Sequence, residues 1–206
     1  MSDLVWYASY GSNLAPERFA CYLQGGCPPG GKREEPGARD RTPPREERAV
    51  ILPGVMFFGW ESATWGGGVS FLDAHADGSA YARAYLITHQ QFADVAAQEM
   101  HRVPGEDLDL AHVLEHRSHS VGPGHYETLH LVGELDGHPM LTFTAEDPEE
   151  IRPNAPTAPY LSTIARGLHE THALGPDPIV DYLLTCPGID GWSTTVLRDV
   201  VTTALT

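Results

Sequence analysis

Residues Val5 to Leu14 read V-W-Y-A-S-Y-G-S-N-L, and this stretch is the most informative in the chain. Its aromatic and β-branched residues predict a strand over 4–10. The small residues at 11–13 break that strand, and a helix is expected over about 14–24. A strand, a small-residue turn and a helix start leave several backbone N–H groups around one point, where an anion or an oxyanion can bind. The alternative is an ordinary strand-to-helix turn with no ligand.

The composition predicts one ordinary globular domain over residues 1–206. Of the 206 residues, 41% are hydrophobic and 20% are charged, which suffices for a normal core. The formal net charge of −15 argues against nucleic acids and anionic membranes as partners. It does not exclude a small acidic substrate, because a local cradle of donors can oppose the overall field.

The chain has only three cysteines, Cys21, Cys27 and Cys186, an odd number with no C-x-x-C pair. Reduced thiols in a cytoplasm are the expectation. The start, Met-Ser-Asp-Leu, lacks a basic region and an apolar run, and no stretch approaches the length of a membrane span. We therefore expect a cytoplasmic protein without a membrane anchor. A thiol enzyme is the less favoured alternative, because no histidine partner can be assigned.

Strand patterns dominate the first two thirds of the chain and helix patterns the last third, which indicates an α+β fold. Strands are expected within 49–60, 69–72 and 80–87, and a hairpin joins 126–134 to 140–144 through Asp136-Gly137. Helices are expected over 157–172, 178–186 and 192–204, so a helical C-terminal region begins at about 157. The stretch 106–120 is ambiguous between helix and strand.

Residues 25–48 are rich in glycine, proline and mixed charge. This composition predicts an inserted loop that is solvated or partly disordered. Its arginines are candidates to cover a pocket, although the sequence alone does not establish that role.

The clearest helix follows Thr88-His89-Gln90-Gln91, a T-x-x-Q capping box. Its inward-facing stripe is expected to contain Phe92, Val95 and Ala96. The spacing continues to Glu99, which therefore lies on the same inward face.

Burial of an ionised carboxylate such as Glu99 on an inward face raises the free energy of the folded state unless the group is paired or partly protonated. Burial raises the pKa of a carboxyl group toward neutrality, which suits a general base. The alternatives are a Glu99 paired with an arginine, such as Arg83 or Arg102, or a slightly rotated helix in which Met100 points inward instead.

Several segments, in order along the chain, resemble the γ-glutamylcyclotransferase-like family, including the cyclotransferases of antibiotic biosynthesis. The similar segments are Y-G-S-N-L at Tyr10–Leu14, T-W-G-G-G-V at Thr64–Val69, the strand and helix of Ala80–Glu99, Gly124-His125-Tyr126, and Ala158-Pro159-Tyr160. The sequence departs from the family pattern in two places, and both bear on which substrate would be bound more than on the reaction itself. Met100 follows the glutamate where the family commonly has glycine, and the insertions at 25–48 and about 103–123 are long.

The resemblance implies a small mixed β-barrel with surrounding helices. It also implies an intramolecular aminolysis, in which the α-amine of a γ-glutamyl substrate attacks its own γ-amide, forms 5-oxoproline and releases an amine or amino acid. Such a reaction needs no cofactor, metal or enzyme nucleophile. Glu99 would be the general base.

The same resemblance places the glutamyl group at the turn formed by Tyr10, Gly11, Ser12, Asn13 and Leu14, whose N–H groups would hold a carboxylate or oxyanion. Two further tyrosines, Tyr126 and Tyr160, are candidates to line the pocket together with Tyr10. The alternative for each tyrosine is ordinary packing in the core.

Two other functions remain open from the sequence. His112, Glu115 and His116 match H-x-x-E-H, a zinc peptidase pattern that would require a firm helix and a third ligand, for which His119 is a candidate. A non-catalytic module that binds a small metabolite would keep the turn at 10–14 but have no use for a buried carboxylate.

Overall fold

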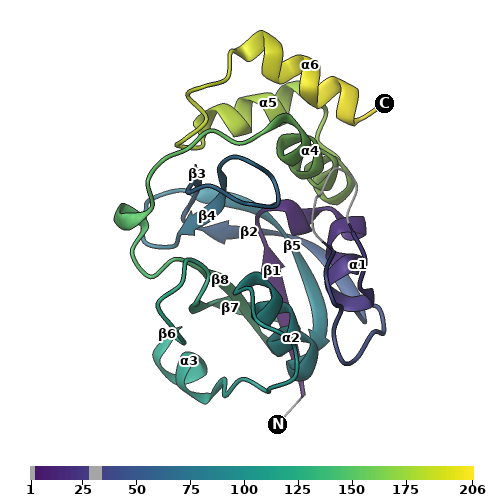
Figure 1. Ribbon diagram of the computed structural model, residues 1–206, viewed down its shortest axis with the longest axis vertical. Coiled ribbons are helices and arrows are strands. Elements are labelled where there is room, and N and C mark those ends of the chain that lie inside the picture. Colours follow the sequence, from purple (N-terminus) through teal and green to yellow (C-terminus); the bar gives the residue numbers. More distant parts are fainter. Residues whose placement is uncertain (1–2, 28–33) are drawn as a thin grey trace.

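The computed structural model describes residues 3–27 and 34–206, which form a mixed sheet with helices packed around it (Figure 1). The strands are β1 (Leu4–Ser9), β2 (Glu46–Pro53), β3 (Val55–Gly59), β4 (Val69–Asp73), β5 (Ser79–Thr88), β6 (Ser118–Ser120), β7 (Thr128–Leu135) and β8 (His138–Thr144). The α-helices are α1 (Pro16–Gln24), α2 (His89–Glu99), α3 (Ala111–His116), α4 (Ala158–His172), α5 (Pro176–Thr185) and α6 (Thr194–Ala204). Short 3₁₀ helices span η1 (Ser12–Leu14) and η2 (Pro148–Glu150).

Strand β1 lies inside a six-stranded sheet of order β2-β5-β1-β8-β7-β6. It pairs antiparallel with β5 and parallel with β8. Its residues alternate between two hydrophobic cores, as the period of a strand requires. Val5 and Tyr7 pack with residues of α1 and α2, whereas Trp6 and Ala8 pack in the core that includes α4, α5 and α6. Figure 1 shows these last three helices together at one end of the molecule.

The sheet does not close into the barrel that the family resemblance implied. Its edges are β2, which pairs with β5, and β6, which pairs with β7, and these two edges are not paired with each other in the described part of the chain. Strand β6 has only three residues, Ser118–Ser120, and offers too short an edge for closure. Strands β3 and β4 form a separate two-stranded sheet. The α+β class is confirmed, and the described residues do not form a closed barrel.

Local signals in the sequence placed most element boundaries correctly. The side chain of Thr88 accepts a hydrogen bond from the backbone N–H of Gln91, and the Gln91 side chain caps Thr88 in return, so the predicted capping box is present. The hairpin of β7 and β8 turns at Asp136 and Gly137, whose φ angles of 51° and 77° are typical of a tight hairpin turn. The ambiguous stretch 106–120 contains both α3 and β6.

The expected loop at 25–48 is more structured than its composition suggested. Residues 28–33 lie outside the described residues, and residues 46–48 belong to strand β2. Between them, Ala38 is buried, and its N–H donates to the carbonyl of Leu23 in α1. Arg39 bonds to Asp94 of α2. Glu35, Gly37 and Ala38 are thus buried within a segment whose other described residues are mostly exposed.

The predicted C-terminal helices correspond to α4, α5 and α6, with starts that differ by at most two residues. None of the helices in residues 3–27 and 34–206 is long and apolar enough to cross a bilayer.

Candidate active site

Two adjoining cavities lie beside the end of β1, and Glu99 lines both of them. The first cavity is bordered by the turn at residues 10–13 and by Ser70. The second is bordered by Arg18, Glu35 and Trp60, among others. Ser12, Tyr126 and Tyr160 also contribute to both cavities, so the two spaces adjoin at Glu99.

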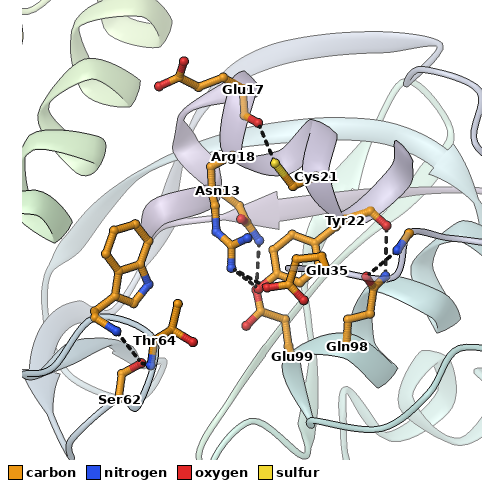
Figure 2. A network of polar contacts seen from close by, with 12 residues as sticks. Asn13, Glu17, Arg18, Cys21, Tyr22, Glu35, Ser62, Thr64, Gln98 and Glu99 are labelled. Atoms are coloured by element: carbon orange, nitrogen blue, oxygen red, sulfur yellow. Dashed lines mark hydrogen bonds and ion pairs between the residues drawn. The ribbon is translucent and has the colours of Figure 1, made fainter. Parts of the chain in front are cut away.

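Glu99 is the last residue of α2, and its carboxylate faces the cavities on the inward side of the helix, as the helical spacing predicted. Its Oε1 atom accepts a hydrogen bond of 2.9 Å from Nδ2 of Asn13 (Figure 2). Burial raises the pKa of Glu99, and the nearby positive charge of Arg18 is the largest influence that opposes this rise. A carboxylate with a raised pKa and access to a cavity has the properties of a general base.

Neither arginine that the sequence offered as a partner for Glu99 occupies that role. Arg83 pairs with Glu47 and Glu170, and Arg102 pairs with Glu127. The cation beside Glu99 is instead Arg18 of α1.

The turn after β1 supplies backbone donors at the first cavity. The first hydrogen bond of η1 runs from the N–H of Leu14 to the carbonyl of Gly11 over 2.9 Å. The N–H groups of Ser12 and Asn13 precede this bond, so they have no partner within the helix. Gly11 allows a close approach, because a Cβ atom there would lie 2.1 Å from Oγ of Ser70. The same turn therefore needs glycine for packing against β4.

The side chain of Asn13 also contains an unsatisfied group. Its Nδ2 atom donates to Glu99 and, over 3.2 Å, to the hydroxyl of Tyr7. Its Oδ1 atom is buried and has no hydrogen-bond donor in the described part of the protein. A buried acceptor without a donor is costly, and a ligand that donates a hydrogen bond would satisfy it.

The three candidate tyrosines line the cavities, but each hydroxyl already has a partner. Tyr10 donates to the carbonyl of Phe143, and Tyr126 donates to the carbonyl of Ser70. The hydroxyl of Tyr160 accepts from the N–H of Ser70 and shares a 2.7 Å hydrogen bond with its Oγ. Burial raises the pKa of all three phenols, so they form neutral walls of the cavities.

Leu14 differs from the other residues that the resemblance placed at the site. Its side chain is fully buried in the core and borders neither cavity. It packs closely against Gly167 of α4, where a Cβ atom would lie 2.5 Å from Leu14. Its side chain thus anchors η1 to α4 and does not line the site.

Sequence reasoning missed Arg18, Tyr22 and Glu35, which form a buried polar cluster beside Glu99 (Figure 2). Nη2 of Arg18 donates to the Tyr22 hydroxyl over 2.7 Å and to Oε1 of Glu35 over 3.1 Å. Arg18 and Tyr22 are four residues apart on α1, which places them on one face of that helix. This spacing could have indicated that Arg18 and Tyr22 lie together. Glu35 could not be found in this way, because it comes from a segment whose composition suggested a loop.

The alternative zinc site does not assemble. His112, Glu115 and His116 all lie at exposed positions of α3, and none of them borders either cavity. Within the described residues, no group of three histidine, cysteine, aspartate or glutamate side chains is placed to hold a metal ion, His119 included.

Comparisons with known proteins bear on the fold. No protein-family model matches the chain. Histone deacetylase 5 of Arabidopsis thaliana is 32% identical over 198 residues, which cover 87% of this chain, so the chain spans about 30% of that relative's length. A solved structure of an uncharacterised Homo sapiens protein matches with a TM-score of 0.54 and 14% identity over 98% of this chain and 99% of that one.

A solved structure of a γ-glutamyl cyclotransferase matches with a TM-score of 0.53 and 14% identity. The match covers 97% of this chain and 99% of that one. At this identity the likeness concerns the fold. The resemblance noted in the sequence is thus confirmed at the level of architecture, and the chain has the γ-glutamyl cyclotransferase fold.

Proposed function

We propose that the protein is a γ-glutamyl cyclotransferase, which converts a γ-glutamyl amide to 5-oxoproline and releases an amine or amino acid. The observation that carries this proposal is the cavity that joins the Glu99 carboxylate to the turn at residues 10–13. The shared fold with γ-glutamyl cyclotransferase supports it.

The glutamyl group fits the first cavity by its chemistry. Its α-ammonium group is a donor, and it would meet two acceptors there, the Glu99 carboxylate and the unsatisfied Oδ1 of Asn13. Its acceptors, the α-carboxylate and the γ-carbonyl oxygen, would meet the N–H groups of Ser12 and Asn13. The γ-carbonyl oxygen gains negative charge during the reaction, so donors placed at that oxygen would stabilise the transition state more than the substrate.

The reaction uses only the substrate and one base. Glu99 takes a proton from the α-ammonium group, and the free amine then attacks the γ-carbonyl carbon to form the new C–N bond of a five-membered ring. The tetrahedral intermediate collapses as the bond to the leaving nitrogen breaks. Glu99 returns its proton to that nitrogen as the bond breaks. The ring nitrogen loses the second of its protons, which the released amine accepts, so the products are 5-oxoproline and a protonated amine.

The geometry supplies two contributions to the rate. A positioned general base typically contributes about 10²- to 10⁴-fold. Holding the glutamyl chain in a folded conformation adds a further gain, because the attacking amine and the carbonyl are brought together before the reaction. The raised pKa of Glu99 suits its task, since a base with an ordinary carboxyl pKa would be a weak acceptor for an ammonium proton.

Incubation of the protein with a panel of γ-glutamyl amino acids and γ-glutamyl amines tests this proposal, with 5-oxoproline and the released amine measured together. Equal amounts of the two products are expected. Binding of the panel without any turnover would instead favour the non-catalytic binding module, and release of glutamate in place of 5-oxoproline would indicate a hydrolase.

A further inference from the structure

Tyr22 of α1 lies between a buried cation and the Glu99 carboxylate. Its side chain is buried, and it borders the second cavity together with Glu99. The Tyr22 hydroxyl accepts a 2.7 Å hydrogen bond from Nη2 of Arg18. A guanidinium group has only donors, so this hydroxyl keeps its own proton for another acceptor. That acceptor is the Glu99 carboxylate, which forms a side-chain hydrogen bond with Tyr22.

Arg18 is held so that its donation to Tyr22 keeps one direction. Its Nη2 atom also bonds to Oε1 of Glu35 over 3.1 Å, and the two side chains of this ion pair are only 4% and 5% exposed. The guanidinium carbon lies 4.3 Å from the centroid of the Tyr22 ring, which adds a cation–π contact. These contacts fix the guanidinium group against the phenol, so the phenol oxygen remains an acceptor and its proton points away from Arg18.

The backbone of Tyr22 is tied to the same end of α2. Its carbonyl accepts a 2.9 Å hydrogen bond from Nε2 of Gln98, the residue before Glu99 (Figure 2). Nε2 of Gln98 also donates to the carbonyl of Asp94 over 3.0 Å. Because the carbonyl and the hydroxyl of Tyr22 contact consecutive residues of α2, the phenol has a fixed position relative to the Glu99 carboxylate.

Other charged and titratable groups also face Glu99. Burial raises the pKa of Glu99 most, and Arg18 lowers it most. The hydrogen bonds from Tyr22 and Asn13 lower the pKa as well, whereas the charge of Glu35 raises it. Further groups around the carboxylate are four buried tyrosines and a histidine that borders the second cavity: Tyr7, Tyr10, Tyr126, Tyr160 and His101. Burial raises the pKa of these four phenols and of Tyr22, so all of them stay neutral where a carboxyl group titrates.

We propose that Tyr22 is a positioning residue for the base: its hydroxyl, oriented by Arg18, holds the Glu99 carboxylate in the ionised form that accepts the substrate proton. This assignment deepens the proposed function, on which its kinetic consequence rests. Tyr22 and Asn13 then hold the carboxylate from two different elements, α1 and η1. Both donors oppose the effect of burial, so the base stays ionised at a lower pH than burial alone would allow.

The variant Tyr22→Phe removes the hydroxyl and keeps the ring, its contact with the guanidinium group and the backbone bond from Gln98. Loss of the donor disfavours the ionised carboxylate, so the pKa of Glu99 should rise. A hydrogen bond to an ionised group corresponds to about one to two pKa units. We therefore expect the acidic limb of kcat/KM to move to higher pH by about one to two units. Above that limb, kcat/KM should stay within a few-fold of the wild type.

A second measurement follows the same carboxyl group without turnover. In protein labelled with ¹³C at the glutamate side-chain carboxyl, the NMR signal that disappears in Glu99→Gln reports the titration of Glu99 itself and separates it from that of His101. The midpoint of this titration should rise in Tyr22→Phe together with the kinetic limb. The control Tyr182→Phe removes a phenol hydroxyl of α5 that contacts Met56 and borders neither cavity, so it should change neither the midpoint nor the rate.

Each outcome has a distinct meaning. A titration of Glu99 in Tyr22→Phe that stays at the wild-type pH or moves to lower pH would overturn the assignment. A fall in kcat/KM by the same factor at every pH would show that Tyr22 only supports the fold, and this would also overturn it. If the wild-type protein turned over no γ-glutamyl amide, the proposed function would fail, and the NMR titration would still decide whether Tyr22 keeps Glu99 ionised.

Discussion

The side-chain amide of Asn13 donates a 2.9 Å hydrogen bond to the carboxylate of Glu99, although the two residues are 86 positions apart in the sequence. This bond joins the turn after β1 to the last residue of α2 and fixes the carboxylate at the junction of the two cavities. It also stabilises the ionised form of Glu99, against the effect of burial. The state of the proposed base therefore depends on a residue of the turn that would bind its substrate.

Substitution of this amide is expected to change the pH dependence of the reaction. Asn13→Asp places a negative charge beside Glu99 and removes a donor, and both changes favour the protonated carboxyl group. The acidic limb of kcat/KM should therefore move to higher pH. Asn13→Ala, which removes the donor to Glu99 without adding a charge, should move it in the same direction by less. If the acidic limb of kcat/KM in Asn13→Asp stayed at the same pH or moved to lower pH, Glu99 would not be the titrating base.

Gly11 should be intolerant of a side chain because Oγ of Ser70 lies 2.1 Å from the position of a Cβ atom. We expect Gly11→Ala to cost about 1–3 kcal/mol of stability, as overpacking of a core usually does, and to lower kcat/KM by displacing the turn. Addition of Ser70→Ala removes the clashing atom and should restore part of the stability.

Gly175→Ala is the matched control for this pair, because no heavy atom lies within 4 Å of the position of its Cβ. Urea unfolding of these three variants and the wild type measures the effect. If the double variant were no more stable than Gly11→Ala, the clash with Ser70 would not be the cause.

Removal of the charge at Glu99 should stabilise the folded protein. Burial raises the pKa of Glu99 above its unfolded value, so the folded state binds the proton more tightly than the unfolded state. Ionisation of Glu99 thus lowers stability as pH rises, and the full loss is present above the folded-state pKa. Glu99→Gln should raise Tm most at pH 8 and little at pH 4, where the carboxyl group is mostly protonated in both states. A lower Tm of this variant at pH 8 would show that the ionised carboxylate is favourable where it lies.

We expect Asp94 to hold the segment after residue 34 in place. This fully buried carboxylate accepts from the backbone N–H of Arg39 over 2.8 Å and from its Nε over 2.9 Å, whereas the exposed Asp107 binds only Nη2 of the same arginine. Asp94→Ala is expected to cost about 2 kcal/mol, because charged hydrogen bonds in a buried setting are lost. Asp107→Ala should cost less than about 1 kcal/mol, as exposed ion pairs do. Equal costs in urea unfolding would contradict this difference.

Local sequence signals predicted those parts of the fold that local interactions determine. The capping box at Thr88, the turn at Asp136-Gly137 and the helical spacing that carries Glu99 inward all depend on residues close in the chain. The edges of the sheet could not be predicted in this way, because closure depends on whether β2 and β6 meet across the whole fold.

The same distinction applies to the site. The turn at residues 10–13 and Glu99 were recognisable singly, one from its small residues and one as a carboxylate on an apolar face. The cluster of Arg18 with Glu35 was not, since Glu35 comes from a segment whose glycine, proline and charge content resembles that of a solvated loop. Its burial results from contacts with α1 that no local pattern encodes.

The most direct test of the account is the rate of 5-oxoproline release from a γ-glutamyl amide by the wild-type protein and by Glu99→Gln. Glutamine keeps the size of the side chain and can still accept from Asn13, but it cannot take a proton. We expect a fall of about 10²- to 10⁴-fold with an unchanged circular dichroism spectrum. The control Glu106→Gln, at an exposed position outside both cavities, should keep the wild-type rate. A Glu99→Gln variant that releases 5-oxoproline at the wild-type rate would contradict the central claim that Glu99 is the base.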